Sequence, residues 1–173
     1  LIGASNALAP VAERDFQVIF KLKEFLETPD QKTSGFNFAI IDCLPSFGHL
    51  HLAALNAADY VLIPIKAAPY ALAGLKDLFE TVEKAKNYFN PGLRVLGIII
   101  NQVDGRKPIM EREMEEVLRD AYGKLVFKNR INKRVKIEES PAFQQPICDY
   151  DPKGPAVCEF KALTNEILRR LKN

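Results

Sequence analysis

The first residues that suggest chemistry are a run of strand-forming side chains that ends in an aspartate. Residues 36–41 are mostly apolar and rich in β formers, and Asp42 follows them directly. A buried strand that ends in aspartate has the form of a Walker B element, in which the carboxylate orients the magnesium ion of a bound nucleotide. The same aspartate is also common as a turn residue or a helix cap, so the strand alone does not decide between the two interpretations.

The residues after Asp42 favour the nucleotide interpretation. Pro45, Ser46 and Gly48 belong to a Pro-Ser-x-Gly turn that leads into a helix. A loop of this kind can contact a γ-phosphate and rearrange when that phosphate is hydrolysed. The segment therefore predicts a nucleotide-responsive loop at the end of a strand.

The surrounding chain alternates between two hydrophobic periodicities. Helical spacing of apolar residues predicts helices at residues 10–27, 50–57, 72–89, 110–121 and 157–171. Continuously apolar runs predict strands at residues 36–41, 60–65, 94–100 and, briefly, 125–127. Buried strands separated by helices of crossover length predict an α/β fold, with a parallel sheet flanked by helices on both faces. Ligands then bind at the carboxyl ends of the strands, which indicates Asp42, residues 66–70 and residues 101–106.

Composition narrows the class of protein. The 173 residues are 47% apolar and 27% charged, which is ordinary for one soluble globular domain. The apolar runs are far too short to span a bilayer. Three cysteines and two histidines show no spacing typical of a metal site or a hydrolase triad.

Basic residues concentrate in one stretch. Six lysines and arginines and no acidic residue lie from position 123 to 136, whereas the whole chain has a formal net charge of only +2. A concentrated basic stretch is the electrostatic footprint expected of nucleic-acid binding. A solvated rim that keeps a protein soluble has the same composition, so both interpretations stay open.

Five motifs stand in order along essentially the whole chain. Residues 40–48 resemble the segment "IIDCPPSLG", and residues 54–75 resemble "ALxAADxVxIPxxxxxYALxGL". Residues 94–101 resemble an "xxGIxx" strand, residues 126–141 resemble "VFxTxIPRNVRLSEAP", and residues 146–154 resemble "PIxxYDPxSxGA". All five are segments of the ParA/Soj partition ATPases, which belong to the MinD/ParA superfamily and carry a deviant Walker A motif. Because several motifs in register are far more specific than one, the chain is identified as a member of this family.

The resemblance implies a P-loop NTPase fold of the SIMIBI type, and it assigns roles by position. Asp42 is the expected Walker B carboxylate and magnesium ligand. Pro45, Ser46 and Gly48 are the expected switch loop beside the γ-phosphate, and with Asp42 they form the candidate catalytic set. Leu44 stands where the family has the first proline of a pair, so the switch loop is expected to be less rigid.

Three further residues are candidates for binding the nucleotide near its base. Asn101 and Asp104 follow the third strand and match family positions close to the base, although polar turn residues would have the same pattern. Asn132 stands in place of the proline of "IPRN", which packs near the adenine in relatives. A base contact at Asn132 is therefore left open.

Two family motifs are absent from the sequence. It contains no G-x-x-x-x-G-K-[ST] loop, no "KGGxGKTT" variant of it and no "DxDPQ" segment. Without such a loop, nothing cradles the phosphates. The expectation is a single ParA-like ATPase domain over residues 1–173 that lacks its N-terminal βαβ part. The intact protein is expected to bind ATP and Mg²⁺ and to hydrolyse ATP, and the chain alone is expected to be inactive.

For the intact protein, the resemblance also implies partners. They are DNA bound without sequence preference, a ParB-like protein that stimulates hydrolysis, and a second copy in an ATP-dependent homodimer. Lys136 aligns with a family arginine in the DNA-binding region, and Arg130, Lys133 and Arg134 are its basic neighbours. The expected location is cytoplasmic and nucleoid-associated, without stable membrane association. Two alternatives stay open: a MinD-like membrane-cycling ATPase and a non-catalytic scaffold without a P-loop. The sequence also leaves open whether the protein partitions a chromosome or a plasmid.

Overall fold

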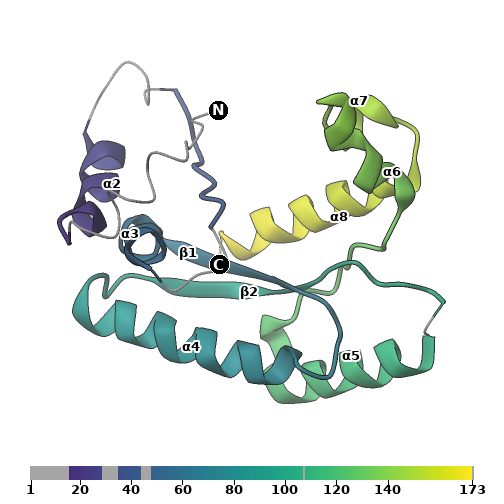
Figure 1. Cartoon of the computed structure of the whole chain (residues 1–173), viewed down its shortest axis with the longest axis horizontal. Coiled ribbons are helices and arrows are strands. Elements are labelled where there is room, and N and C mark those ends of the chain that lie inside the picture. Colours follow the sequence, from purple (N-terminus) through teal and green to yellow (C-terminus); the bar gives the residue numbers. More distant parts are fainter. Residues whose placement is uncertain (1–15, 29–34, 44–47, 107, 173) are drawn as a thin grey trace. The chain divides into compact units, whose positions relative to one another are not determined.

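The computed structural model describes residues 16–28, 35–43, 48–106 and 108–172 of the chain (Figure 1). The chain divides into two compact units. The first contains residues up to Val61 together with Leu78–Arg94, and the second contains Leu62–Asp77 together with Val95–Asn173. Most of the residues that build the candidate site belong to the second unit.

In the part of the chain that the structure describes, the sheet has two strands: β1 (Tyr60–Ile65) and β2 (Arg94–Ile100). At one end, the amide of Arg94 donates to the carbonyl of Asp59 at 3.0 Å. At the other end, the amide of Asn101 donates to the carbonyl of Ile65 at 2.7 Å. Both strands therefore run in the same direction, and both have the bounds that the sequence predicts.

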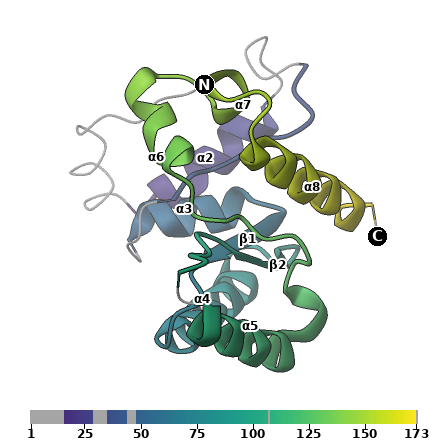
Figure 2. The same ribbon diagram turned by 90° about the vertical axis from the view of Figure 1, so that its right-hand side faces the viewer.

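The buried residues of β2 form the core of the second unit. Residues 96–100 are all buried. Helices α5 (Pro108–Tyr122) and α8 (Pro155–Arg170) lie on opposite sides of this strand (Figure 1, Figure 2). They contribute the buried side chains of Leu118 and Leu163. A parallel strand covered on both faces is continuously apolar, which is why the sequence predicts β2 well.

The segment after α5 differs from the predicted fourth strand. A 3-10 helix at Gly123–Leu125 takes up part of it, and Val126 forms only a single parallel bridge with β2. The amide of Phe127 donates to the carbonyl of Ile98 at 2.8 Å, but the following amides, those of Lys128 and Asn129, donate to the carboxylate of Glu166. The segment therefore runs beside β2 with isolated backbone bonds and forms no continuous ladder.

The first unit contains α2 (Val18–Glu27), α3 (His49–Ala57) and the second half of α4 (Ala71–Tyr88). The buried side-chain amide of Asn56 on α3 donates to the carbonyl of Ile19 on α2 at 3.0 Å, which joins the two helices. Asn90 donates to the carbonyls of Leu55 and Ala58, at the end of α3. These helices match the predicted ones, except that α2 begins only at Val18, because residues 16 and 17 form a turn. The part of the first predicted helix before residue 16 lies outside the described residues.

One predicted strand is wrong, because residues 36–41 form no strand in the structure. Phe38 and Ile40 are 63% and 95% exposed, although the sequence predicts a buried strand. A strand needs neighbours that share its backbone hydrogen bonds, and no described segment pairs with these residues. Hydrophobicity and β propensity identify a strand-forming segment here, but pairing decides whether the strand forms.

Short helices connect the segment beside β2 to α8. They are α6 (Val135–Glu139), the 3-10 helix η2 (Ser140–Phe143) and α7 (Ile147–Tyr150). The rings of Phe143 and Tyr150 stack with their centroids 5.3 Å apart, which holds η2 against α7. Among the described residues, no helix combines the length and the apolar character needed to cross a membrane.

Candidate functional site

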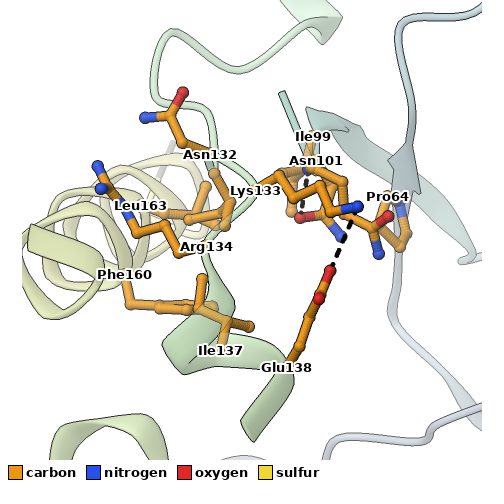
Figure 3. A pocket seen from close by; sticks show the side chains of 12 residues that line it. Pro64, Ile99, Asn101, Asn132, Lys133, Arg134, Ile137, Glu138, Phe160 and Leu163 are labelled. Carbon is orange, nitrogen blue, oxygen red and sulfur yellow. Dashed lines mark hydrogen bonds and ion pairs between the residues drawn. The ribbon is translucent and has the colours of Figure 1, made fainter. Parts of the chain in front are cut away.

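A cavity of about 250 Å³ lies beside the carboxyl ends of β1 and β2 in the second unit (Figure 3). Its apolar wall includes Ile99, Ile131 and Leu163, and its polar rim includes Asn101 and Gln102. Parallel strands bring such residues together because their carboxyl ends meet at one edge of the sheet. An apolar slot with amides at its rim suits a flat heteroaromatic ring whose edge needs hydrogen-bond partners.

The loop after β2 is held in a tight turn by its own side chains. The side-chain oxygen of Asn101 accepts the amide of Gln102 at 2.9 Å, and Gln102 has a left-handed backbone with φ of 56°. The NH₂ group of Asn101 carries two further donors, and the side chain lines the cavity. Asn101, which the sequence predicts to lie near a nucleotide base, therefore lies at the rim of the cavity.

Asp104 is not among the residues that line this cavity. Its Oδ2 lies 2.7 Å from Nη2 of Arg106, and its Oδ1 accepts the Arg106 amide at 3.1 Å. These hydrogen bonds from Arg106 hold the pKa of Asp104 far below its usual range. The amide of Asp104 donates to Glu111 on α5 at 2.9 Å. Asp104 thus shapes the loop and does not line the cavity, and its expected role near the base stays a prediction.

Asn132 borders the cavity, but Figure 3 shows its side chain directed away from the centre. Its Nδ2 donates to Oε1 of Glu159 at 2.7 Å, and its backbone amide donates to Oε2 at 3.0 Å. Arg134 pairs with the same carboxylate. Burial raises the pKa of Glu159, but the hydrogen bonds from Arg134 and Asn132 outweigh that effect and leave it below its usual value.

Lys133 and Glu138 form an ion pair at one side of the cavity, with Nζ 3.6 Å from Oε1 (Figure 3). Their side chains are 43% and 59% exposed, so the pair is accessible to solvent. Lys133, which the sequence predicts to contact DNA, is therefore also a cavity residue. A polar ligand that enters from this side meets both a cation and an anion.

The residues predicted to contact the nucleotide phosphates belong to the first unit. Asp42 is exposed, and the residues before it form no strand. Gly48 is the N-cap of α3, so the predicted helix begins directly after it. Pro45 and Ser46 lie outside the described residues, so their expected role stays a prediction.

All four residues predicted to bind DNA have carboxylate partners. The pairs are Arg130 with Glu115 at 2.8 Å, Lys133 with Glu138 at 3.6 Å, Arg134 with Glu159, and Lys136 with Asp151 at 3.6 Å. Lys136 also lies 5.9 Å from the centroid of the Tyr150 ring. The basic stretch is therefore partly neutralised by acidic residues outside it, which its own composition does not reveal; Glu138 follows it closely, whereas Glu159 lies on α8.

Two polar residues at or behind the cavity are not predicted from the sequence: Glu138 and Glu159. Gln102, in contrast, lies within residues 101–106, where the strand-end argument expects a ligand to bind. Glu159 is 27 positions from Asn132. The only sequence signal for Glu159 is its spacing from Glu166, which places both carboxylates on one face of α8, two turns apart.

Comparison with known proteins decides the family. The sequence model of the AAA domain family matches residues 1–95. The chromosome partitioning protein ParA of Myxococcus xanthus is 36% identical over 98% of this chain, and the sporulation initiation inhibitor protein Soj of Bacillus subtilis is 34% identical over 96%. The chain belongs to the ParA/Soj family. It spans 57% of the length of the first relative and 63% of the second.

Solved structures agree with the predicted fold. The crystal structure of cobyrinic acid a,c-diamide synthase from Mycobacterium smegmatis with bound ADP and magnesium has a TM-score of 0.65 and 28% identity, over 76% of this chain and 53% of that one. A plasmid partition protein from Borrelia burgdorferi has a TM-score of 0.59 and 23% identity, over 87% of this chain and 58% of that one, which supports the fold alone. The predicted α/β P-loop NTPase fold and the predicted family are confirmed.

Proposed function

We propose that this ParA/Soj chain belongs to an ATP-dependent partitioning ATPase and that its second unit holds the base of the nucleotide. The observation that carries the proposal is the cavity at the strand ends, where an apolar wall meets side-chain amides. Ile99 and Ile131 can cover a purine ring, and the NH₂ group of Asn101 can donate to its edge. The relative from Myxococcus xanthus is a chromosome partitioning protein, and a structural neighbour holds ADP and magnesium, which supports this choice of ligand.

The proposed phosphate end rests on the motif at Asp42 and on the start of α3. Asp42 is exposed, so its carboxylate is accessible to a hydrated magnesium ion. Gly48 caps α3, so a rearrangement of the loop before it would reach a helix directly. Pro45 and Ser46 complete the proposed switch loop. ATP, when bound, supplies the phosphoryl transfer that drives the cycle.

The proposed DNA contact is the basic segment of the second unit. The Lys136 side chain is 56% exposed and can exchange Asp151 for a DNA phosphate. Phosphate contacts of this kind give affinity without sequence preference. In the proposed cycle, ATP drives a homodimer onto DNA, and a ParB-like partner then stimulates hydrolysis and release. This activity would place the protein on the nucleoid, in the cytoplasm.

Equilibrium ATP binding by the full encoded protein tests the proposed base site. Asn101→Ala removes the donor at the rim and is expected to weaken ATP binding about tenfold. Asn165→Ala changes an exposed asparagine of α8 that does not line the cavity, and it is expected to leave the affinity unchanged. Equal affinities of the two variants, or no ATP binding by the unaltered protein, would contradict the proposal.

A further inference from the structure

Glu159 on α8 gathers three hydrogen-bond donors from one short segment beside the cavity. They are the backbone amide of Asn132, its side-chain NH₂ group and the guanidinium of Arg134. The side chain of Glu159 is only 17% exposed, so water has little access to replace it as an acceptor. The carboxylate therefore ties two side chains and one backbone group to α8.

The opposite edge of the same segment is bonded to the loop after β2. The amide of Val103 donates to the carbonyl of Ile131 at 3.1 Å, and the amide of Lys133 donates to the carbonyl of Val103 at 2.8 Å. Asn132 and Arg134 turn the other way, toward α8, because side chains alternate along an extended segment (Figure 3). One wall of the cavity is thus an extended segment that is clamped on both edges.

We infer that Glu159 is a positioning residue for the nucleotide-base cavity: it acts through Asn132 and Arg134 and does not touch the nucleotide. The inference rests on the proposed function, because it names a residue that prepares the proposed base site. Glu159 itself does not line the cavity, whereas both of its partners do.

Loss of the carboxylate would leave polar groups without an acceptor beside the cavity. The amide of Asn132 and the guanidinium of Arg134 would then have to find other partners, and the nearest open space is the cavity itself. The Nε atom of Arg134 is already buried without a hydrogen-bond partner among the described residues, so this side chain has little alternative bonding. The wall would shift toward the base, and nucleotide affinity would fall.

The residue at position 132 explains why a hydrogen-bond acceptor is needed at position 159. The ParA/Soj motif "IPRN" has proline there, and proline has no amide hydrogen to satisfy. This chain has asparagine, which adds a backbone donor and a side-chain donor, and Glu159 accepts both. Asn132 and Glu159 therefore work as a pair, which makes the inference testable by a double substitution.

The first test compares Glu159→Gln with Glu166→Gln in the full encoded protein. Glutamine keeps the shape of the side chain but has one acceptor oxygen in place of two. Glu166 is the matched control because it also sits on α8 and accepts two backbone amides, yet neither Glu166 nor the two residues that donate those amides line the cavity. Both variants are expected to lower the melting temperature, but only Glu159→Gln is expected to weaken ATP binding, by about tenfold.

The second test removes the donors of Asn132 that need the carboxylate of Glu159 as an acceptor. Glu159→Val is expected to lose ATP affinity, and adding Asn132→Pro to it is expected to recover part of the loss because the amide donor is gone. A purely structural role would lower the melting temperature without this recovery of ATP affinity.

The unaltered protein is measured first, with ATP as the probe. If it binds ATP and Glu159→Gln binds equally well, or if Glu159→Gln and Glu166→Gln lose the same affinity, the inference fails while the proposed base site survives. If the unaltered protein does not bind ATP, the proposed function fails and the inference fails with it.

Discussion

Gly97 packs directly against Phe127, so closely that a Cβ atom at position 97 would lie 2.6 Å from the phenyl ring. The same Cβ would meet the carbonyl of Leu125 and Nη1 of Arg170. Gly97 is in β2, and Phe127 is fully buried beside it. The close approach lets the segment that forms one wall of the cavity run next to the strand that forms another.

Gly97→Ala should therefore destabilise the protein by about 2 kcal/mol, because the backbone of Leu125 cannot move away without loss of core packing. Urea unfolding of the full encoded protein measures the difference. Gly74→Ala is the control, since nothing lies within 4 Å of its Cβ position on α4. That variant should be neutral or slightly more stable, because alanine favours a helix over glycine. Equal stability of the two variants would show that β2 and Phe127 do not pack as described.

Arg170 holds the end of α8 against the same region. Its guanidinium lies 3.7 Å from the centroid of the Phe127 ring and donates to three backbone carbonyls, those of Leu96, Leu125 and Val126. Arg170→Lys should cost about 2 kcal/mol, because an ammonium group cannot stack on a ring and also reach these acceptors. Thermal unfolding compares it with Arg169→Lys, the exposed neighbour, which should change little.

Glu166 should make stability depend on pH. Burial raises its pKa, but hydrogen bonds from the amides of Lys128 and Asn129 and from other donors outweigh this and hold the pKa below the ordinary 4.5. A carboxyl group whose pKa is lower in the folded state stabilises the fold above its unfolded pKa, and this contribution is lost as the pH falls through the folded pKa.

Urea unfolding from pH 7 down to about pH 3 measures this contribution. The free energy of unfolding should fall below about pH 4.5 in the unaltered protein, and less steeply in Glu166→Gln, which cannot titrate at that position. Parallel profiles would mean that the hydrogen bonds to Glu166 do not persist in solution.

The ion pair between Lys136 and Asp151 should limit DNA affinity, because Asp151 competes with a phosphate for the same ammonium group. Asp151→Asn should bind DNA about threefold more tightly than Asp149→Asn, the matched control on α7. Both variants lose one negative charge, and Asp149 is exposed and forms no ion pair with a described residue. The measurement is equilibrium binding of duplex DNA with ATP present, and equal affinities of the two variants would contradict the competition.

The sequence predicts best where one local property decides the structure. The bounds of β2 are confirmed because its residues 96–100 are apolar and buried, as expected of a strand covered on both faces. Residues 36–41 have the same local property, yet they form no strand, because pairing depends on other segments. Local hydrophobicity therefore predicts what a segment can form, and neighbours decide whether it does so.

The candidate site was predicted in part for a related reason. Asn101 lies beside the cavity, as expected for a residue at the carboxyl end of a parallel strand. Two contacts join positions far apart in the chain: Asn132 with Glu159, and Lys136 with Asp151. Local sequence patterns do not predict such contacts. Composition shows that charges are present, but only the fold shows which of them are already neutralised.

DNA binding by the full encoded protein, with and without ATP, tests the central claim of a ParA/Soj partitioning ATPase most directly. Lys136→Ala is compared with Lys161→Ala, which removes an equal charge from an exposed position on α8. A partitioning ATPase of this kind is expected to show DNA binding that requires ATP, weakens with salt and falls in Lys136→Ala but not in Lys161→Ala. Binding to anionic vesicles that requires ATP, with no binding to DNA under the same conditions, would contradict it.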